Sequence, residues 1–188
     1  GVSRRKLSKR KDPEARVGYY DEAGYPIPAV LDYLLTIGSA DYEPWREEHM
    51  DASIYDFPLD LSKTGAAGAL FDFDKLNNVA KKRIGHMPEE QIFDAVSAWA
   101  KRYDAKLSRY MEDNGDAFRR SIAVWHEKRL DVAKWSDLME LYPYMYDPAF
   151  TVDAAALPES FLPHKERIPE ILADYLIVFD YEDGAAEW

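Results

Sequence analysis

Apolar residues recur three and four positions apart along most of the chain. This spacing places them on one face of a helix, so the chain is predicted to be mainly α, with at most short strands. In the first half the pattern predicts helices at 13–24, 28–37, 44–48 and 73–86. The second of these reads V-L-D-Y-L-L-T-I from Val30 and is apolar nearly all round, which predicts a buried helix.

The second half of the chain continues the helical pattern. Pro88 opens a helix whose apolar residues, from Ile92 to Ala100, keep this spacing as far as Tyr103. Further helices are predicted at 107–112, from Asp116 onward, at 137–145 and at 169–181. In two of them we expect these residues in the core: Phe118, Ile122, Val124, Trp125, Ile171, Leu172, Tyr175, Leu176, Val178 and Phe179.

Certain residues mark where these helices begin and end. Gly24 and Gly38 are expected to end the first two helices. Asp72, Asp116 and Ser136 are expected to cap later helices, because their side-chain oxygens can accept hydrogen bonds from free backbone N–H groups.

The composition is that of a soluble globular protein. The 188 residues suffice for one large domain or two small ones, and 47% of them are apolar. No apolar run approaches the roughly 20 residues that span a bilayer. The absence of Cys excludes disulfides, thiolate zinc sites and Cys nucleophiles, and is compatible with the cytoplasm.

The beginning of the chain differs in charge from the rest. Residues 1–12 contain six Lys or Arg and one acid, whereas the whole chain has a net charge of −11. A basic, Ser-containing segment on an acidic protein predicts an anionic ligand, with phosphate the natural candidate. Since a phosphate-binding loop needs a scaffold on both sides, we expect this chain to be a piece of a longer protein.

Lys6-Leu7-Ser8-Lys9-Arg10 resembles the second signature motif of class I aminoacyl-tRNA synthetases, in the form typical of the glutamyl-tRNA synthetase family. Two later stretches, from Gly24 to Leu35 and from Ser62 to Leu76, resemble the segments that follow this motif in the family. Residues 130–138 are similar to part of its helical anticodon-side domain.

The resemblance implies three parts. Residues 1–12 would be a loop at the edge of a catalytic domain, 13–87 a helical stem-contact-like domain, and 88–188 part of an α-helical anticodon-side bundle. It further implies a ligase that joins glutamate to tRNA(Glu) through glutamyl-adenylate. Its substrates would be ATP, L-glutamate and tRNA(Glu), and Mg²⁺ would accompany the ATP. We expect a monomer, and no activity from this part alone.

The ATP-binding residues implied by the resemblance are Lys6, Ser8, Lys9 and Arg10, with Lys9 against the phosphates. Arg83-Ile84-Gly85-His86 resembles the other class I signature, H-I-G-H, but follows the first motif and lacks the first His. It is interpreted as a helix end before Pro88.

Basic residues on the predicted helices are candidates for contacts to the tRNA backbone. They are equally compatible with a solvated face paired to nearby acids. The candidates are Lys81, Lys82, Arg83, Lys101, Arg102, Lys106, Arg109, Arg119, Arg120, Lys128 and Arg129.

Other readings of the sequence are weighed against these. The aromatic cluster around Tyr142, Tyr144 and Tyr146 could stack on bases, but we favour a helical core. The four His are scattered, so no metal site is predicted. The alternative function is a non-enzymatic tRNA-binding or protein-interaction module on a synthetase-like scaffold.

Overall fold

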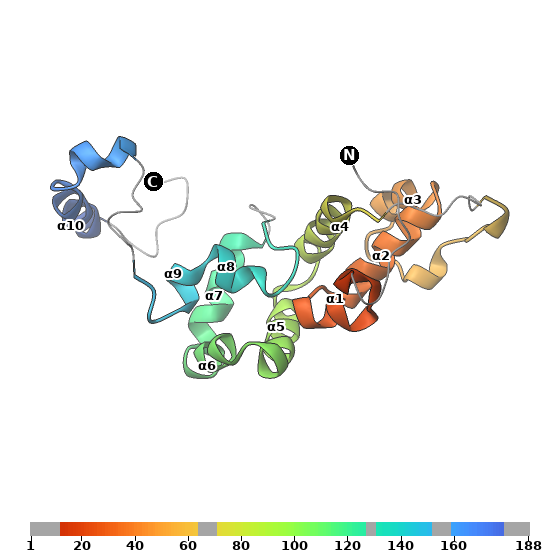
Figure 1. Ribbon diagram of the computed structural model, residues 1–188, viewed down its shortest axis with the longest axis horizontal. Coiled ribbons are helices and arrows are strands. Elements are labelled where there is room, and N and C mark those ends of the chain that lie inside the picture. The colour runs from red at the N-terminus through yellow and green to blue at the C-terminus, as the bar shows by residue number, and fades with distance from the viewer. Residues whose placement is uncertain (1–11, 64–70, 127–130, 152–158, 179–188) are drawn as a thin grey trace. The chain divides into compact units, whose positions relative to one another are not determined.

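The structure is a computed structural model that describes residues 12–63, 71–126, 131–151 and 159–178. It divides into two compact units, Gly1–Ala149 and Phe150–Trp188. The described residues form α-helices and 3-10 turns and contain no strand (Figure 1). The predicted mainly-α class is confirmed.

The first unit begins with two helices joined by a glycine turn. A 3-10 turn at Pro13–Ala15 precedes α1 (Val17–Ala23), and α2 spans Ile27–Gly38. The predicted continuous helix from Pro13 is therefore wrong, because Arg16 is extended and interrupts it. Gly24 ends α1 in the left-handed conformation, as predicted.

Two further helices complete this half of the unit. Helix α3 spans Tyr42–Glu48, and α4 spans Phe73–Gly85 and packs against α2 (Figure 1). Asp72 caps α4 as predicted, since its side chain accepts from the N–H groups of Asp74 and Lys75. Residues buried between α1, α2 and α4 form one apolar core, whose larger members are Tyr20, Tyr25, Val30, Tyr33 and Leu76.

The rest of the first unit is a bundle of helices around a second core. Its elements are α5 (Glu89–Tyr103), α6 (Ala105–Asp113), α7 (Gly115–Trp125), α8 (Asp137–Leu141) and α9 (Pro143–Tyr146). The core includes Ile92, Val96, Phe118, Ile122, Trp125, Leu138 and Tyr146.

Contacts join the two cores of the first unit. The N–H of Trp135 donates to the carbonyl of Gly24 at 2.9 Å, and the indole N–H of Trp99 donates to the carbonyl of Glu22 at 3.2 Å. Ala133 lies in the core formed by α1, α2 and α4. The two sides of the predicted boundary at residue 87 are thus in direct contact, and the division itself stays a prediction.

Several local predictions are wrong. The predicted helix at 137–145 is two short helices, because Tyr142 precedes Pro143 and leaves the helical conformation. Asp116 lies inside the first turn of α7 and Ser136 makes no side-chain cap hydrogen bond. Val124 is exposed.

Helix α2 is less buried than its apolar sequence predicts. Ala29, Val30 and Tyr33 lie in the core, whereas Ile27, Leu31 and Leu34 are exposed. The exposed residues follow one another at four and three positions, so they form one stripe along the helix.

The described part of the second unit contains a 3-10 segment, Glu159–His164, and α10 (Ile168–Val178). The predicted core position of α10 is wrong for the four residues Ile171, Leu172, Tyr175 and Leu176. Each is between 45% and 70% exposed. Phe179 lies outside the described residues.

Candidate nucleic-acid interface

The predicted ATP-binding residues Lys6, Ser8, Lys9 and Arg10 lie outside the described residues, and their assignment stays a prediction. Lys128 and Arg129 also lie outside them. The other basic candidates belong to α4, α5, α6 and α7, whose surroundings the structure describes.

A buried polar cluster lies beneath α3 and α4. The carboxylate of Asp32, on α2, accepts a hydrogen bond from the hydroxyl of Tyr42 and lies 3.1 Å from Nη2 of Arg46. All three residues are buried. Burial, followed by the hydrogen bond to Asp32, raises the pKa of Tyr42 to about 12.

Arg46 also holds the loop that follows α3. Its Nη1 donates to the carbonyls of His49 at 3.0 Å, Met50 at 3.4 Å and Ala52 at 2.7 Å. Its Nε and Nη2 both donate to the hydroxyl of Tyr42. The guanidinium group is thus fully engaged inside the fold, which a flexible Lys could not reproduce.

Arg83 belongs to this cluster rather than to a free basic surface. Its Nε lies 3.7 Å from Asp32 Oδ2, and its Nη1 donates to the carbonyl of Met50 at 2.8 Å. Its side chain is 22% exposed. These contacts give Arg83 a structural role. The sequence alone had made it a candidate for contact with tRNA.

The remaining lysines of α4 surround a hollow of about 540 Å³. The ammonium group of Lys75 lies 2.7 Å from Oε2 of Glu43, and that of Lys82 lies 2.8 Å from Oε1 of Glu47. Lys81 has no ion pair within the described residues. The hollow is lined by Glu43, Lys75, Asn78, Val79, Lys81, Lys82 and Asp131.

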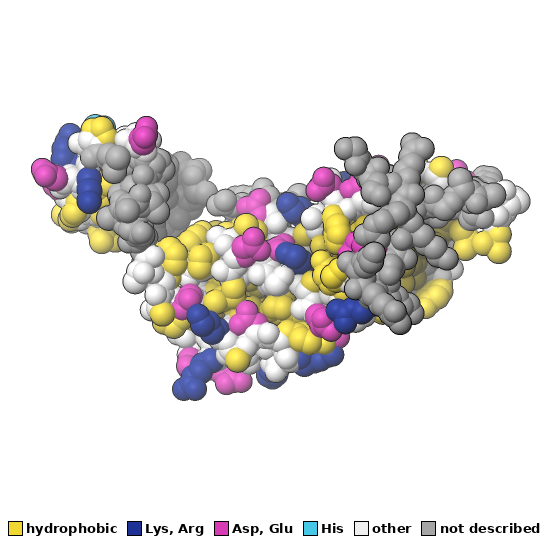
Figure 2. Space-filling model, viewed as in Figure 1, with side chains coloured by type: hydrophobic (Ala, Val, Ile, Leu, Met, Phe, Trp, Pro, Cys, Tyr) yellow, Lys and Arg dark blue, Asp and Glu magenta, His cyan; other side chains and the backbone are white. Residues whose placement is uncertain are grey.

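Most basic candidates on α5, α6 and α7 are paired with acids. Arg102 lies 2.8 Å from Asp21, Lys106 3.4 Å from Asp147, Arg109 3.7 Å from Asp113, and Arg119 3.2 Å from Glu90. These cations are exposed, so each pair contributes little to stability and can open for another anion. Figure 2 shows basic and acidic side chains interspersed on this view of the molecule.

Two of these pairs are reinforced by aromatic rings. The guanidinium of Arg119 lies 3.6 Å from the ring centroid of Phe93, and that of Arg102 lies 4.7 Å from the ring of Tyr103. The hydroxyl of Tyr103 donates to Asp21 and, with the Arg102 guanidinium, lowers the pKa of that carboxyl. Lys101 and Arg120 have no ion pair within the described part of the chain.

The structure also tests the other functional candidates that the sequence offered. His86 is the C-cap of α4, so Arg83-Ile84-Gly85-His86 is a helix end, as predicted. Tyr142 and Tyr146 are buried in the core, as favoured, while Tyr144 is exposed. The described residues contain no group of three or more metal-ligating side chains, and among them no helix is long and apolar enough to cross a membrane.

The Asp32 cluster was missed by sequence reasoning. The signal that could have found it is the single Asp within the apolar stretch of α2. A carboxylate on a buried helix face requires a cation or hydrogen-bond donors close by. The residues that supply this cation and these donors depend on how α3 and α4 pack. The sequence pattern does not predict that packing.

Comparison with known proteins identifies what this chain is similar to. A glutamate--tRNA ligase of Clostridium beijerinckii is 40% identical over 193 residues, covering 100% of this chain and 34% of the relative. The glutamate--tRNA ligase of Acetivibrio thermocellus is 35% identical, covering 98% of this chain and 34% of the relative. That of Sorangium cellulosum is 34% identical, covering 99% of this chain and 33% of the relative.

The chain therefore corresponds in sequence to part of a glutamate--tRNA ligase, the enzyme also called glutamyl-tRNA synthetase, and the resemblance is confirmed. It spans about a third of the length of the curated relatives that it matches. No family model matches it, and no solved structure matches it.

Proposed function

We propose that this chain is part of a glutamate--tRNA ligase. Such an enzyme joins glutamate to tRNA(Glu) in the cytoplasm at the expense of ATP. The observation that carries the proposal is the similarity to glutamate--tRNA ligases over essentially the whole chain, at 34–40% identity. No observation favours a non-enzymatic module instead.

In this proposal the basic segment at residues 1–12 binds the phosphates of ATP. A glutamate carboxylate attacks the α-phosphorus, which gives glutamyl-adenylate and releases pyrophosphate. A hydroxyl of the terminal ribose of the tRNA then takes the glutamyl group and AMP leaves. Catalysis of this kind requires positioning and charge stabilisation rather than a protein nucleophile.

Within this reaction Lys6 and Lys9 neutralise negative charge on the phosphates, with Lys9 touching ATP, and Ser8 and Arg10 support the loop. Mg²⁺ accompanies the nucleotide and shares this role. The two ammonium groups act as point charges, so they can follow the phosphates as charge moves onto the leaving pyrophosphate.

The helical part of the chain supplies contacts to the tRNA backbone in this proposal. Lys81, Lys101 and Arg120 are the strongest of the basic candidates, because no acid neutralises them within the described residues. Lys82, Arg102, Lys106, Arg109 and Arg119 can contribute after opening exposed ion pairs. Arg83 is the weakest candidate because it binds Asp32 and Met50.

The proposal is tested by binding of the 188-residue chain to tRNA(Glu) and to an unrelated tRNA across a salt series. We expect tighter binding to tRNA(Glu) and an affinity that falls steeply with salt, because bound lysines release counterions from the phosphates. Absence of binding at low salt would contradict the proposed role of the helices. ATP–pyrophosphate exchange is expected to be absent from this chain alone.

A further inference from the structure

We propose that Asp21, on α1, is a positioning residue for ATP binding. The hydrogen bonds that it accepts from α5 hold the short helix that follows the ATP-binding segment. The inference rests on the proposed function, in which residues 1–12 bind the phosphates of ATP. It is carried by the shortness of α1 and by the contacts that hold its two ends.

Helix α1 is too short to hold its own position. It has seven residues, whereas an isolated helix of fewer than about 12 residues is marginal in water. Tyr20 is its one buried residue, and Val17 at its N-terminal end is 85% exposed. The place of α1 in the fold therefore depends on the groups that bond to it from other elements.

The N-terminal side of α1 is joined to the turn that follows the ATP-binding segment. The hydroxyl of Tyr20 donates to the carbonyl of Glu14 at 2.7 Å, inside the 3-10 turn Pro13–Ala15. This turn begins directly after Asp12, the buried residue at which the described structure starts. The position of α1 therefore sets the point at which the ATP-binding segment joins the described fold.

The C-terminal end of α1 is held by side chains of α5. Arg102 donates to both carboxylate oxygens of Asp21, at 3.2 Å and 2.8 Å, and the hydroxyl of Tyr103 donates to Oδ2 of Asp21 at 2.7 Å. A bidentate pair of this kind fixes direction as well as distance. Three hydrogen bonds from the last turn of α5 therefore converge on one carboxylate of α1.

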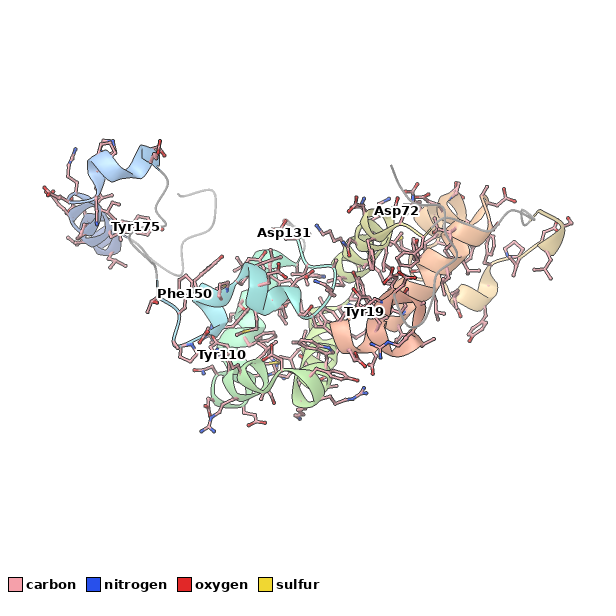
Figure 3. All side chains as sticks on the ribbon, viewed as in Figure 1. Tyr19, Asp72, Tyr110, Asp131, Phe150 and Tyr175 are labelled. Carbon is pink, nitrogen blue, oxygen red and sulfur yellow. The ribbon has the colours of Figure 1, made fainter. Side chains whose placement is uncertain are left out.

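Two buried tryptophans hold the backbone at the same end of α1. The indole N–H of Trp99 donates to the carbonyl of Glu22 at 3.2 Å, and the backbone N–H of Trp135 donates to that of Gly24 at 2.9 Å. Figure 3 labels Tyr19 on α1, which lies beside α5, the helix that carries Trp99. The end of α1 is thus attached to the second core and not to the first core alone.

Asp21 can be changed without disturbing either core. Its side chain is 40% exposed, so its ion pair contributes little to stability. Without the carboxylate, the two tryptophan contacts keep α1 attached but no side chain of α5 fixes its direction. A displacement of about 1 Å at a binding group is enough to weaken its action on a substrate. Loss of this carboxylate should therefore affect ATP binding before it affects folding.

The experiment measures charging of tRNA(Glu) by the full-length ligase that contains this chain, with ATP, L-glutamate and tRNA varied in turn. The proteins are the unchanged enzyme, Asp21→Ala, Tyr103→Phe and the controls Asp113→Ala and Tyr55→Phe. Asp113, on α6, lies 3.7 Å from Arg109, so both Asp variants remove one charge and free one arginine. Tyr55 is 91% exposed. Thermal unfolding of each variant verifies that the fold is retained.

Asp21→Ala is expected to raise the KM for ATP about threefold to tenfold and to leave the KM for L-glutamate and for tRNA(Glu) unchanged. Tyr103→Phe is expected to raise the KM for ATP by a smaller factor, because it removes one of three hydrogen bonds. A merely structural role would reduce the amount of folded enzyme, which lowers kcat and leaves the KM for ATP unchanged. Both controls are expected to match the unchanged enzyme.

The other outcomes count against the inference in distinct ways. If the unchanged enzyme is active and Asp21→Ala has the same KM for ATP as Asp113→Ala, the inference is overturned and the proposed function stands. If Asp21→Ala changes the KM for tRNA(Glu) and not that for ATP, the carboxylate only masks Arg102 and the positioning role is wrong. If the unchanged enzyme does not charge tRNA(Glu), the proposed function fails and the inference fails with it.

Discussion

The backbone amide of Trp135 donates a hydrogen bond to the carbonyl of Gly24 at 2.9 Å. This bond joins the turn after α1 to the segment before α8, at the point where Gly24 adopts a φ of +86°. A Cβ atom at this position would lie 2.9 Å from the Cβ of Trp135 and from the ring of Trp99. Gly24 is therefore required both by its backbone conformation and by the close approach of two tryptophans.

Gly24→Ala is expected to lower the free energy of unfolding by about 2–4 kcal/mol, because it combines an unfavourable left-handed residue with overpacking. Urea denaturation measures the change. The matched control is Gly38→Ala, since nothing lies within 4 Å of the added methyl group and Gly38 is helical. The control is expected to be neutral or slightly stabilising. Equal destabilisation by both variants would refute this account of Gly24.

Asp32→Asn is expected to cost about 3 kcal/mol of stability, because it leaves the guanidinium groups of Arg46 and Arg83 without their buried counter-charge. Glu22→Gln is the control, since Glu22 pairs with Arg16 at 3.7 Å where both side chains are more than half exposed. We expect this control to change the free energy of unfolding by less than about 0.5 kcal/mol. A small effect at Asp32 would show that the cluster does not depend on its carboxylate.

Tyr146→Phe is expected to destabilise the second core by about 1–3 kcal/mol. The hydroxyl of Ser121 donates to the carbonyl of Phe118, so the Tyr146 hydroxyl donates to Ser121 and accepts from the indole N–H of Trp125. Removing it leaves the buried N–H of Trp125 without a partner. Thermal unfolding compares this variant with Tyr55→Phe, whose ring is 91% exposed and whose change is expected to have no effect.

Stability is expected to fall as the pH rises from about 10 towards 12. Burial raises the pKa of Tyr20, Tyr42 and Tyr146 to about 12, whereas tyrosine in an unfolded chain ionises near 10. The unfolded state therefore loses protons first, so the stabilisation is fully present below pH 10 and is lost as pH approaches 12. Urea titrations at several alkaline pH values, with tyrosinate absorbance, measure both effects. A constant free energy of unfolding over this interval would contradict the prediction.

Helices with strong local signals were predictable from sequence. Helix α4 begins after Asp72, whose side chain caps it, and α5 runs to Tyr103 as its apolar spacing predicts. These predictions succeed because capping and amphipathic spacing act within a few residues. The helix predicted from Pro13 and the one predicted at 137–145 failed where backbone conformation at Arg16 and Tyr142 breaks them.

Burial and pairing were harder to predict. The apolar sequence of α2 does not reveal that Leu31 and Leu34 face away from the core, and that of α10 does not reveal its exposure. Similarly, the basic residues of α5 to α7 were ambiguous until the structure placed Asp21, Glu90 and Asp147 beside three of them. An ion pair between distant residues depends on which helices become neighbours.

The sequence by itself determined the helical class, because apolar residues three and four positions apart act within a few residues. It also determined the resemblance to glutamyl-tRNA synthetases, because that depends on short stretches such as Lys6-Leu7-Ser8-Lys9-Arg10. Only the tertiary structure decided which charges remain available. Packing turned Arg83 inward against Asp32 and left Lys81 without an acid among the described residues, although the two stand two positions apart on α4. Local sequence fixes which face of a helix a side chain occupies, whereas its partner is set by the neighbouring elements.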